Sequence, residues 1–199
     1  MKHQGWEVGE TSRGLTDRQV GQLEAYEGLL RTHAIPFGLI AASDEANLRD
    51  RHLRDSLRGA ALVSATDRLA IDLGSGAGLP GVPVAIACPD LELVLAESRR
   101  TRAAFLELVV ETLGLSGVRV HGGRVEDLRA SADLCFARAF RPASKSWKEA
   151  ERLLSPSGRL VYWAGTSFEL RDVPDGVRCE VFPSVALARS GPLVMMSRQ

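Results

Sequence analysis

The sequence predicts an α/β fold in which an open, largely parallel sheet carries helices on both faces. From about residue 69 onward, short apolar runs alternate with stretches of helical periodicity, which is typical of consecutive βαβ units. The first run passes directly into the loop 74–81, which is rich in glycine. Glycines or acidic residues follow the first three runs at their carboxyl ends, where open α/β sheets bind ligands. These observations indicate a ligand site at that edge of the sheet.

The chain before the sheet is expected to be helical. Residues 1–14 are predicted to be a flexible start, and residues 15–63 a helical extension. Thr16 and Gln19 have the spacing of a capping box, so a helix is expected to begin there. It should end before Pro36, because proline cannot continue a helix interior.

A second helix is predicted after Ser43 or Asp44, either of which can cap its first turn. Spacings of three and four residues place several of its polar side chains on one face. They are Arg51, His52, Asp55 and Ser56. Such a face is either a solvated surface or part of a site, and the residues alone leave both interpretations open.

Residues 64–199 are expected to form one domain built on a seven-stranded mixed sheet. Strands are predicted at 69–73, 91–97, 118–121, 133–138, 159–163, 177–182 and 193–198, and helices at 80–87, 101–113 and 144–154. Turn residues at 155–158 are expected to separate the last helix from the fifth strand. The last two strands should pair antiparallel at the sheet edge. This is a Rossmann-like plan.

The glycine loop favours S-adenosylmethionine (SAM) over a dinucleotide. A dinucleotide loop reads G-x-G-x-x-G, and its third glycine would stand at Leu79. Here Gly74, Gly76 and Gly78 give G-x-G-x-G, with Asp72 two residues before the first glycine. That spacing is the usual opening of a SAM site, whose ligand has no pyrophosphate. A glycine turn with a purely structural role is the alternative.

Two further acidic positions support a nucleoside ligand. Glu97 ends the second predicted strand, where a carboxylate can accept hydrogen bonds from both ribose hydroxyls. Glu126 and Asp127 follow the third strand, in a loop of the kind that commonly covers the adenine ring. Each acid taken singly can also be an ordinary strand-end charge.

The composition of the chain limits which partners and compartments are expected. The chain has 199 residues, 45% of them hydrophobic, with 25 basic and 25 acidic side chains, so no overall field attracts nucleic acid. No apolar run reaches membrane length and no export signal is evident, so a cytoplasmic protein without a membrane partner is expected. Cys88, Cys135 and Cys179 are scattered, which indicates reduced thiols and no metal site.

Five motifs make the chain similar to a known family, from about residue 16 to residue 197. They are Arg51-His52-x-x-Asp55-Ser56, Gly74-x-Gly76-x-Gly78-Leu79-Pro80-Gly81-x-Pro83, Glu97-Ser98 with Arg102 and Phe105-Leu106, Arg124-Val125-Glu126, and Arg138-Ala139-Phe140. The chain resembles the bacterial 16S rRNA guanine-N7 methyltransferases, also called glucose-inhibited division B proteins. The resemblance implies a Rossmann-like class I SAM-dependent methyltransferase fold.

The resemblance also implies an activity and a set of site residues. The cofactor is SAM, and the acceptor is N7 of a guanine in 16S rRNA or in the small ribosomal subunit. The resemblance implies SAM contacts at Gly74, Leu79, Val125, Glu126 and Arg138, with Glu97 and Ser98 near the ribose. The pattern of the glycine loop adds Asp72, Gly76 and Gly78 as candidate SAM contacts. Candidate catalytic residues are Arg138, His52 and Arg51, the last two in a cap over the site. No stable protein partner is implied, so a monomer is expected.

The chain departs from the family pattern in three places. Apolar Ala34 and its neighbours replace polar residues before the second helix, and Thr101 and Ala164 stand where the family tends to carry lysine. A divergent paralogue with another acceptor, or a non-catalytic adenosine-binding protein, therefore stays open. An NAD-dependent oxidoreductase is disfavoured by Leu79.

Overall fold

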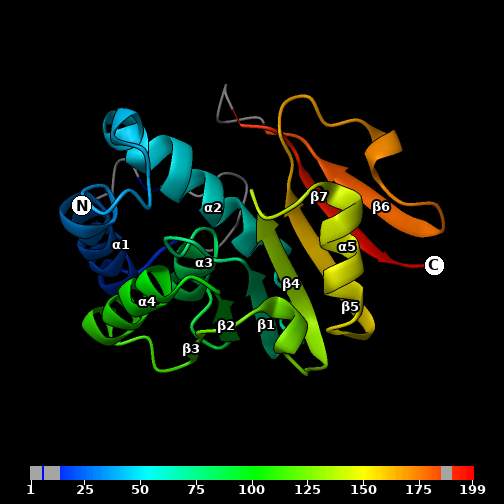
Figure 1. Cartoon of the computed structure of the whole chain (residues 1–199), viewed down its shortest axis with the longest axis horizontal. Helices are drawn as coiled ribbons and strands as arrows, with labels where there is room; N and C mark the ends of the chain where they lie inside the picture. Colours follow the sequence, from blue (N-terminus) through cyan, green and yellow to red (C-terminus); the bar gives the residue numbers. More distant parts are fainter. Residues whose placement is uncertain (1–5, 7–13, 185–189) are drawn as a thin grey trace.

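The computed structural model describes residue 6 and residues 14–184 and 190–199, and it contains one seven-stranded sheet (Figure 1). The strand order is β3-β2-β1-β4-β5-β7-β6. The bounds are β1 Leu69–Leu73, β2 Glu92–Ala96, β3 Val118–His121, β4 Ala132–Arg138, β5 Leu154–Trp163, β6 Val177–Phe182 and β7 Leu193–Arg198. Strands β1 to β5 pair parallel, whereas β7 runs antiparallel to both β5 and β6. The predicted mixed sheet and its antiparallel edge are confirmed.

Helices cover both faces of the sheet, as predicted. They are α3 Gly81–Ala87, α4 Arg100–Leu113 and α5 Ala143–Glu151. Alternate residues of the buried strands face opposite sides. Ala70 packs in the core that includes α3 and α4, while Ile71 packs in the core that includes Trp147 and Ala150 of α5. The sheet therefore separates two hydrophobic cores.

The helical extension packs on the α3 and α4 side. Helix α1 (Asp17–Leu29) begins at Thr16 with the predicted capping box and continues as a π-helical turn, Leu30–Ala34. Buried side chains of α1, such as Leu23 and Tyr26, lie in the same core as those of α3 and α4. In Figure 1 the extension, blue to cyan, lies at one end of the molecule, and β6 and β7 lie at the other.

The second helical segment is irregular. It consists of a 3-10 turn Ala42–Asn47, a π-helical turn Leu48–Arg54, the short helix α2 (Asp55–Leu57) and a 3-10 turn Arg58–Leu62. The predicted cap at Ser43 or Asp44 is wrong, because the cap position is Ala41 and no side chain caps the turn. The Asp44 carboxylate instead accepts hydrogen bonds from the side chains of Arg51 and His52.

The predicted turn at 155–158 is also wrong in part. Strand β5 already begins at Leu154, and its register against β4 shifts between the pair Ala132–Leu154 and the pair Leu134–Arg159. The extra residues are accommodated as an irregularity in the strand, where a Cβ atom on Gly158 would lie 2.8 Å from the Ala132 carbonyl oxygen. Glycine thus permits this close approach.

The predicted flexible start at residues 1–14 falls almost entirely outside the described residues. Trp6 is described: it is buried, and the Arg49 guanidinium lies 4.6 Å from its ring centroid. Among the described helices none is both long enough and apolar enough to span a bilayer. Within the same residues, no disulfide joins the cysteines and no group of acidic, histidine or cysteine side chains has the arrangement of a metal site.

Candidate cofactor and active site

The glycine loop after β1 exposes bare backbone at one point. Gly74, Gly76 and Gly78 have φ values of +70°, +60° and +97°, in the left-handed region that favours glycine. A Cβ atom on Gly74 would lie 2.5 Å from the Phe140 ring, and one on Gly78 would lie 2.7 Å from Val82. A Cβ atom on Gly76 would meet nothing closer than 3.9 Å. Gly76 therefore faces open space in which a ligand can approach the backbone.

Glu97 ties this loop to the end of β2. Its buried carboxylate accepts hydrogen bonds from the Gly76 amide at 3.0 Å and from the Arg99 amide at 2.7 Å. A carboxylate has about four acceptor sites, so two such bonds leave capacity for a ligand's hydroxyl groups. Arg102 lies 4.0 Å from the same carboxylate.

A cavity of about 180 Å³ opens beside Glu97 at the carboxyl edge of the sheet. It is lined by Gly74, Ala96, Glu97, Ser98, Gly123, Arg124, Val125, Glu126, Phe140 and Arg141. Five predicted cofactor residues are thus brought together: Gly74, Glu97, Ser98, Val125 and Glu126. The other predicted contacts, Asp72, Gly76, Gly78, Leu79 and Arg138, are not part of its lining.

Arg141 also lines this cavity, although it is not among the site residues predicted from the sequence. Its guanidinium contacts Glu126 at 2.7 Å and Glu149 of α5 at 2.9 Å, and lies 4.9 Å from the centroid of the Phe140 ring. The Glu126 backbone amide and the Arg141 guanidinium lower the pKa of the Glu126 carboxyl. Arg141 therefore fixes the loop after β3 against α5. No local sequence signal marks this contact, because the three segments meet only in the folded sheet.

Asp72 lies beneath the loop rather than in the cavity. Its Oδ2 atom accepts a hydrogen bond from the Gly81 amide at 3.1 Å, while its buried Oδ1 atom has no partner among the described residues. Burial raises the pKa of this carboxyl to about 7, and the Ser75 hydroxyl and Gly81 amide offset only part of that effect. Asp72 thus anchors the start of α3 and keeps an unused acceptor.

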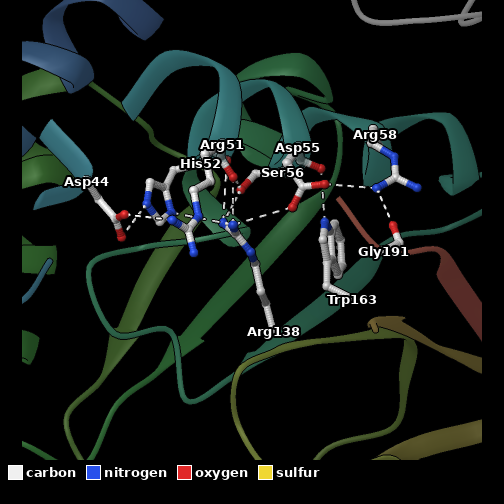
Figure 2. Close-up of polar contacts among 9 residues, drawn as sticks. All are labelled: Asp44, Arg51, His52, Asp55, Ser56, Arg58, Arg138, Trp163 and Gly191. Atoms are coloured by element: carbon white, nitrogen blue, oxygen red, sulfur yellow. Dashed lines mark hydrogen bonds and ion pairs between the residues drawn. The ribbon is translucent and has the colours of Figure 1, made fainter. Parts of the chain in front are cut away.

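Arg138 leaves the end of β4 and points into the extension, as Figure 2 shows. Its guanidinium donates to the Arg51 carbonyl at 2.9 Å and to the Ser56 hydroxyl at 3.2 Å, and it lies 3.4 Å from the Asp55 carboxylate. Asp55 also pairs with Arg58 at 2.8 Å. The predicted polar helix face is therefore the docking site for Arg138.

His52 is held at both ring nitrogens. Nε2 lies 3.2 Å from the Asp44 carboxylate and Nδ1 lies 3.4 Å from the Arg138 guanidinium, so the proton is assigned to Nε2 (Figure 2). Burial and the Arg138 charge lower the pKa of the imidazole, and Asp44 opposes them. The candidate catalytic residues Arg51, His52 and Arg138 are thus brought into one network, and none of them lines the cavity.

Comparisons with known proteins point in one direction. A family model described as rRNA small subunit methyltransferase G matches residues 19–172. The Ribosomal RNA small subunit methyltransferase G of Acidothermus cellulolyticus is 38% identical over 159 residues, which cover 80% of this chain and 71% of that protein. Its namesake from Paracoccus denitrificans is 39% identical over 153 residues, covering 76% of this chain and 79% of its own length.

The fold also has solved counterparts. The mitomycin 7-O-methyltransferase MmcR superposes with a TM-score of 0.61 over 92% of this chain and 69% of its own, at 17% identity. At that identity the likeness concerns the fold, which is the Rossmann-like plan of class I methyltransferases.

Proposed function

The chain belongs to the rRNA small subunit methyltransferase G family, and from this premise we propose that it transfers the methyl group of SAM to N7 of a guanine in small-subunit ribosomal RNA. The observation that carries the proposal is the cavity at the carboxyl edge of the sheet, where Gly74, Glu97 and Glu126 converge. Open α/β sheets bind nucleotides at this edge.

The residues present fit an adenosine ligand. Glu97 would accept the ribose hydroxyls, and Val125 and Glu126 would contact the adenine ring. The open backbone at Gly76 would receive the methionine part. When bound, SAM supplies an electrophilic methyl group on a sulfonium, and the protein's task is to hold and orient the two reactants.

Guanine N7 suits a site of this kind. It carries a lone pair and no proton, so methyl transfer requires no general base. Among the candidate catalytic residues, His52 is the one whose side chain could act as a general base. Its Nε2 atom contacts Asp44, however, and its Nδ1 atom contacts Arg138. We therefore expect His52, Arg51 and Arg138 to position the extension against β4.

The substrate is rRNA or the small subunit, and we expect the enzyme to act on it in the cytoplasm as a monomer. Arg99 and Arg100 are exposed at the start of α4, near the cavity residue Ser98, and can contact phosphates. RNA presents its bases best in loops, so the target guanine is expected there.

Methyl transfer from tritiated SAM tests the proposal. Label is expected in ribosomal RNA or small subunits, to resist protease, and to appear as 7-methylguanosine after digestion to nucleosides. Transfer should weaken as salt rises, because cationic contacts to phosphates release counterions. Label in a small metabolite and none in RNA would support a divergent paralogue. Tight SAM binding with no transfer to any acceptor would support a non-catalytic protein.

A further inference from the structure

A second and larger cavity, of about 560 Å³, lies between the start of α5, the end of β5 and the segment that follows it. We call it the acceptor cavity. It is lined by Pro142, Ala143, Ser144, Tyr162, Gly165, Ser167, Phe168, Arg171, Asp172, Val173, Pro174 and Asp175. None of these residues belongs to the predicted site.

The acceptor cavity adjoins the cofactor cavity. Phe140 and Arg141 line the cofactor cavity, and the next residues along the chain, Pro142 and Ala143, line the acceptor cavity. The Tyr162 hydroxyl donates to the Arg141 carbonyl at 3.3 Å, so both walls meet at Arg141. The segment 140–143 is therefore a wall that the two cavities share.

The lining suits a flat heterocycle with donors along one edge. Tyr162, Phe168 and Pro174 offer apolar surfaces on which a base can stack. Asp172 offers an acceptor. Guanine is the RNA base whose Watson–Crick edge carries two adjacent donors, N1–H and the N2 amine, and a carboxylate can accept from both. Because N7 lies on the opposite edge of the purine, this grip leaves it free to react.

Two observations indicate that the Asp172 carboxylate can accept hydrogen bonds from a base in the cavity. Its Oδ2 atom accepts from the Glu169 amide at 2.9 Å, which fixes the side chain and leaves acceptor capacity. Both Asp172 and Tyr162 line the cavity, and the pKa of the Tyr162 hydroxyl is raised first by burial and then by the Asp172 charge, so the two groups interact electrostatically.

The surroundings favour a nucleotide within RNA over a free base. Helix α5 begins at Ala143 with no side-chain cap, and the first residues of the helix line the cavity. Lys145 and Lys148 are exposed on the same helix, and neither forms an ion pair within the described part of the chain. Cations and helix amides beside a base pocket can hold the flanking phosphates.

We propose that the acceptor cavity receives the target guanine, with Asp172 reading its N1–H and N2 amine and with Tyr162 and Phe168 stacking against the ring. This inference rests on the proposed function, since it supplies the substrate site for that reaction.

The test uses the full chain and rRNA fragments in which the methylated guanine is kept or replaced by inosine, which lacks the N2 amine. Wild type should lose about tenfold in kcat/KM on inosine, as expected for one lost charge-assisted hydrogen bond. Asp172→Asn retains an oxygen for the Glu169 amide but loses the charge. It should be about tenfold less active on guanine, treat both substrates alike, and bind SAM as wild type does.

Ser144→Trp provides a second, independent variant, because it would place a bulky ring at the wall of the acceptor cavity from the exposed start of α5. It should raise the KM for RNA while leaving SAM affinity unchanged. Glu180→Gln, on the exposed edge strand β6, is the matched control and should change neither quantity. If wild type transfers methyl to RNA while both cavity variants retain full efficiency and discrimination, this inference is wrong. If wild type transfers none to RNA, the proposed function itself fails.

Discussion

The three glycines of the loop after β1 differ in their surroundings: two pack against neighbouring side chains, and one faces open space in which a ligand can bind. Gly74 and Gly78 leave no room for a Cβ atom, whereas Gly76 has open space before it. Gly76→Asp would place a carboxylate beside Glu97, which already bonds the Gly76 amide. SAM binding should be lost while the chain stays folded, as measured by calorimetry and thermal unfolding.

Gly176→Asp is the control for backbone strain in that experiment, because Gly176 has a φ of +76° and no neighbour within 4 Å of a Cβ atom. It should carry a similar strain of about 1 kcal/mol and bind SAM normally. Equal loss of SAM binding in both variants would contradict a ligand at Gly76.

Glu97 is expected to bind the cofactor without acting on the chemical step. Glu97→Ala should raise the SAM dissociation constant by roughly 10- to 100-fold, the effect of losing charge-assisted hydrogen bonds. The single-turnover rate at saturating SAM should stay close to wild type, because this contact is common to the ground and transition states. A rate that falls at saturation would show that Glu97 does more than bind.

Arg141 is expected to act on the cofactor through Glu126. Arg141→Ala frees the loop after β3 from α5 and should raise the SAM dissociation constant several-fold, with partial recovery in Arg141→Lys. Arg159→Ala breaks a comparable 2.7 Å pair with Asp67, and neither of those residues lines the cavity, so it should leave SAM affinity unchanged. Equal SAM affinities of Arg141→Ala and wild type would show that Arg141 does not support cofactor binding.

At the scale of elements, the link between β4 and the extension depends on Asp55, which pairs with both Arg138 and Arg58. Asp55→Asn leaves two largely buried guanidinium groups without their carboxylate. It should lower the free energy of unfolding by about 3 kcal/mol in urea titrations. Asp50→Asn removes an exposed pair with Arg54 and should cost less than about 0.5 kcal/mol. Equal effects would mean that the buried network contributes no more than a surface pair.

What the sequence can predict at this scale depends on how local the signal is. Neighbouring residues determine the strands and the loop from Gly74 to Gly78, and apart from the earlier start of β5 at Leu154 their expected positions agree with the structure. The docking of Arg138 on Arg51 joins positions 87 residues apart. The contact of Arg141 with Glu126 likewise joins two segments, 15 residues apart, whereas His52 and Asp44 are only eight residues apart and meet because the helical segment between them is irregular. Motif spacing marks such residues without showing what they touch.

At the scale of the whole molecule, Asp72 makes stability depend on pH. Its folded pKa of about 7 lies above the ordinary value of 3.8, so the folded state holds an extra proton between these values. The free energy of unfolding should therefore fall as pH rises from about 4 to about 7. Asp72→Asn should remove that loss and exceed wild type by at most about 4 kcal/mol above pH 7. Urea titrations at pH 5 and pH 8 measure the difference, and a gap that does not change with pH would contradict this assignment.

The central claim is that this molecule methylates guanine N7 in small-subunit rRNA. The most direct measurement compares 16S rRNA from cells with and without the gene, by mass spectrometry of nuclease fragments and by chain cleavage at 7-methylguanosine. One 7-methylguanosine should be present with the gene, absent without it, and restored by the wild-type gene but not by Gly76→Asp. Identical methylation in both strains, or loss of a methyl group from an atom other than guanine N7, would contradict the claim.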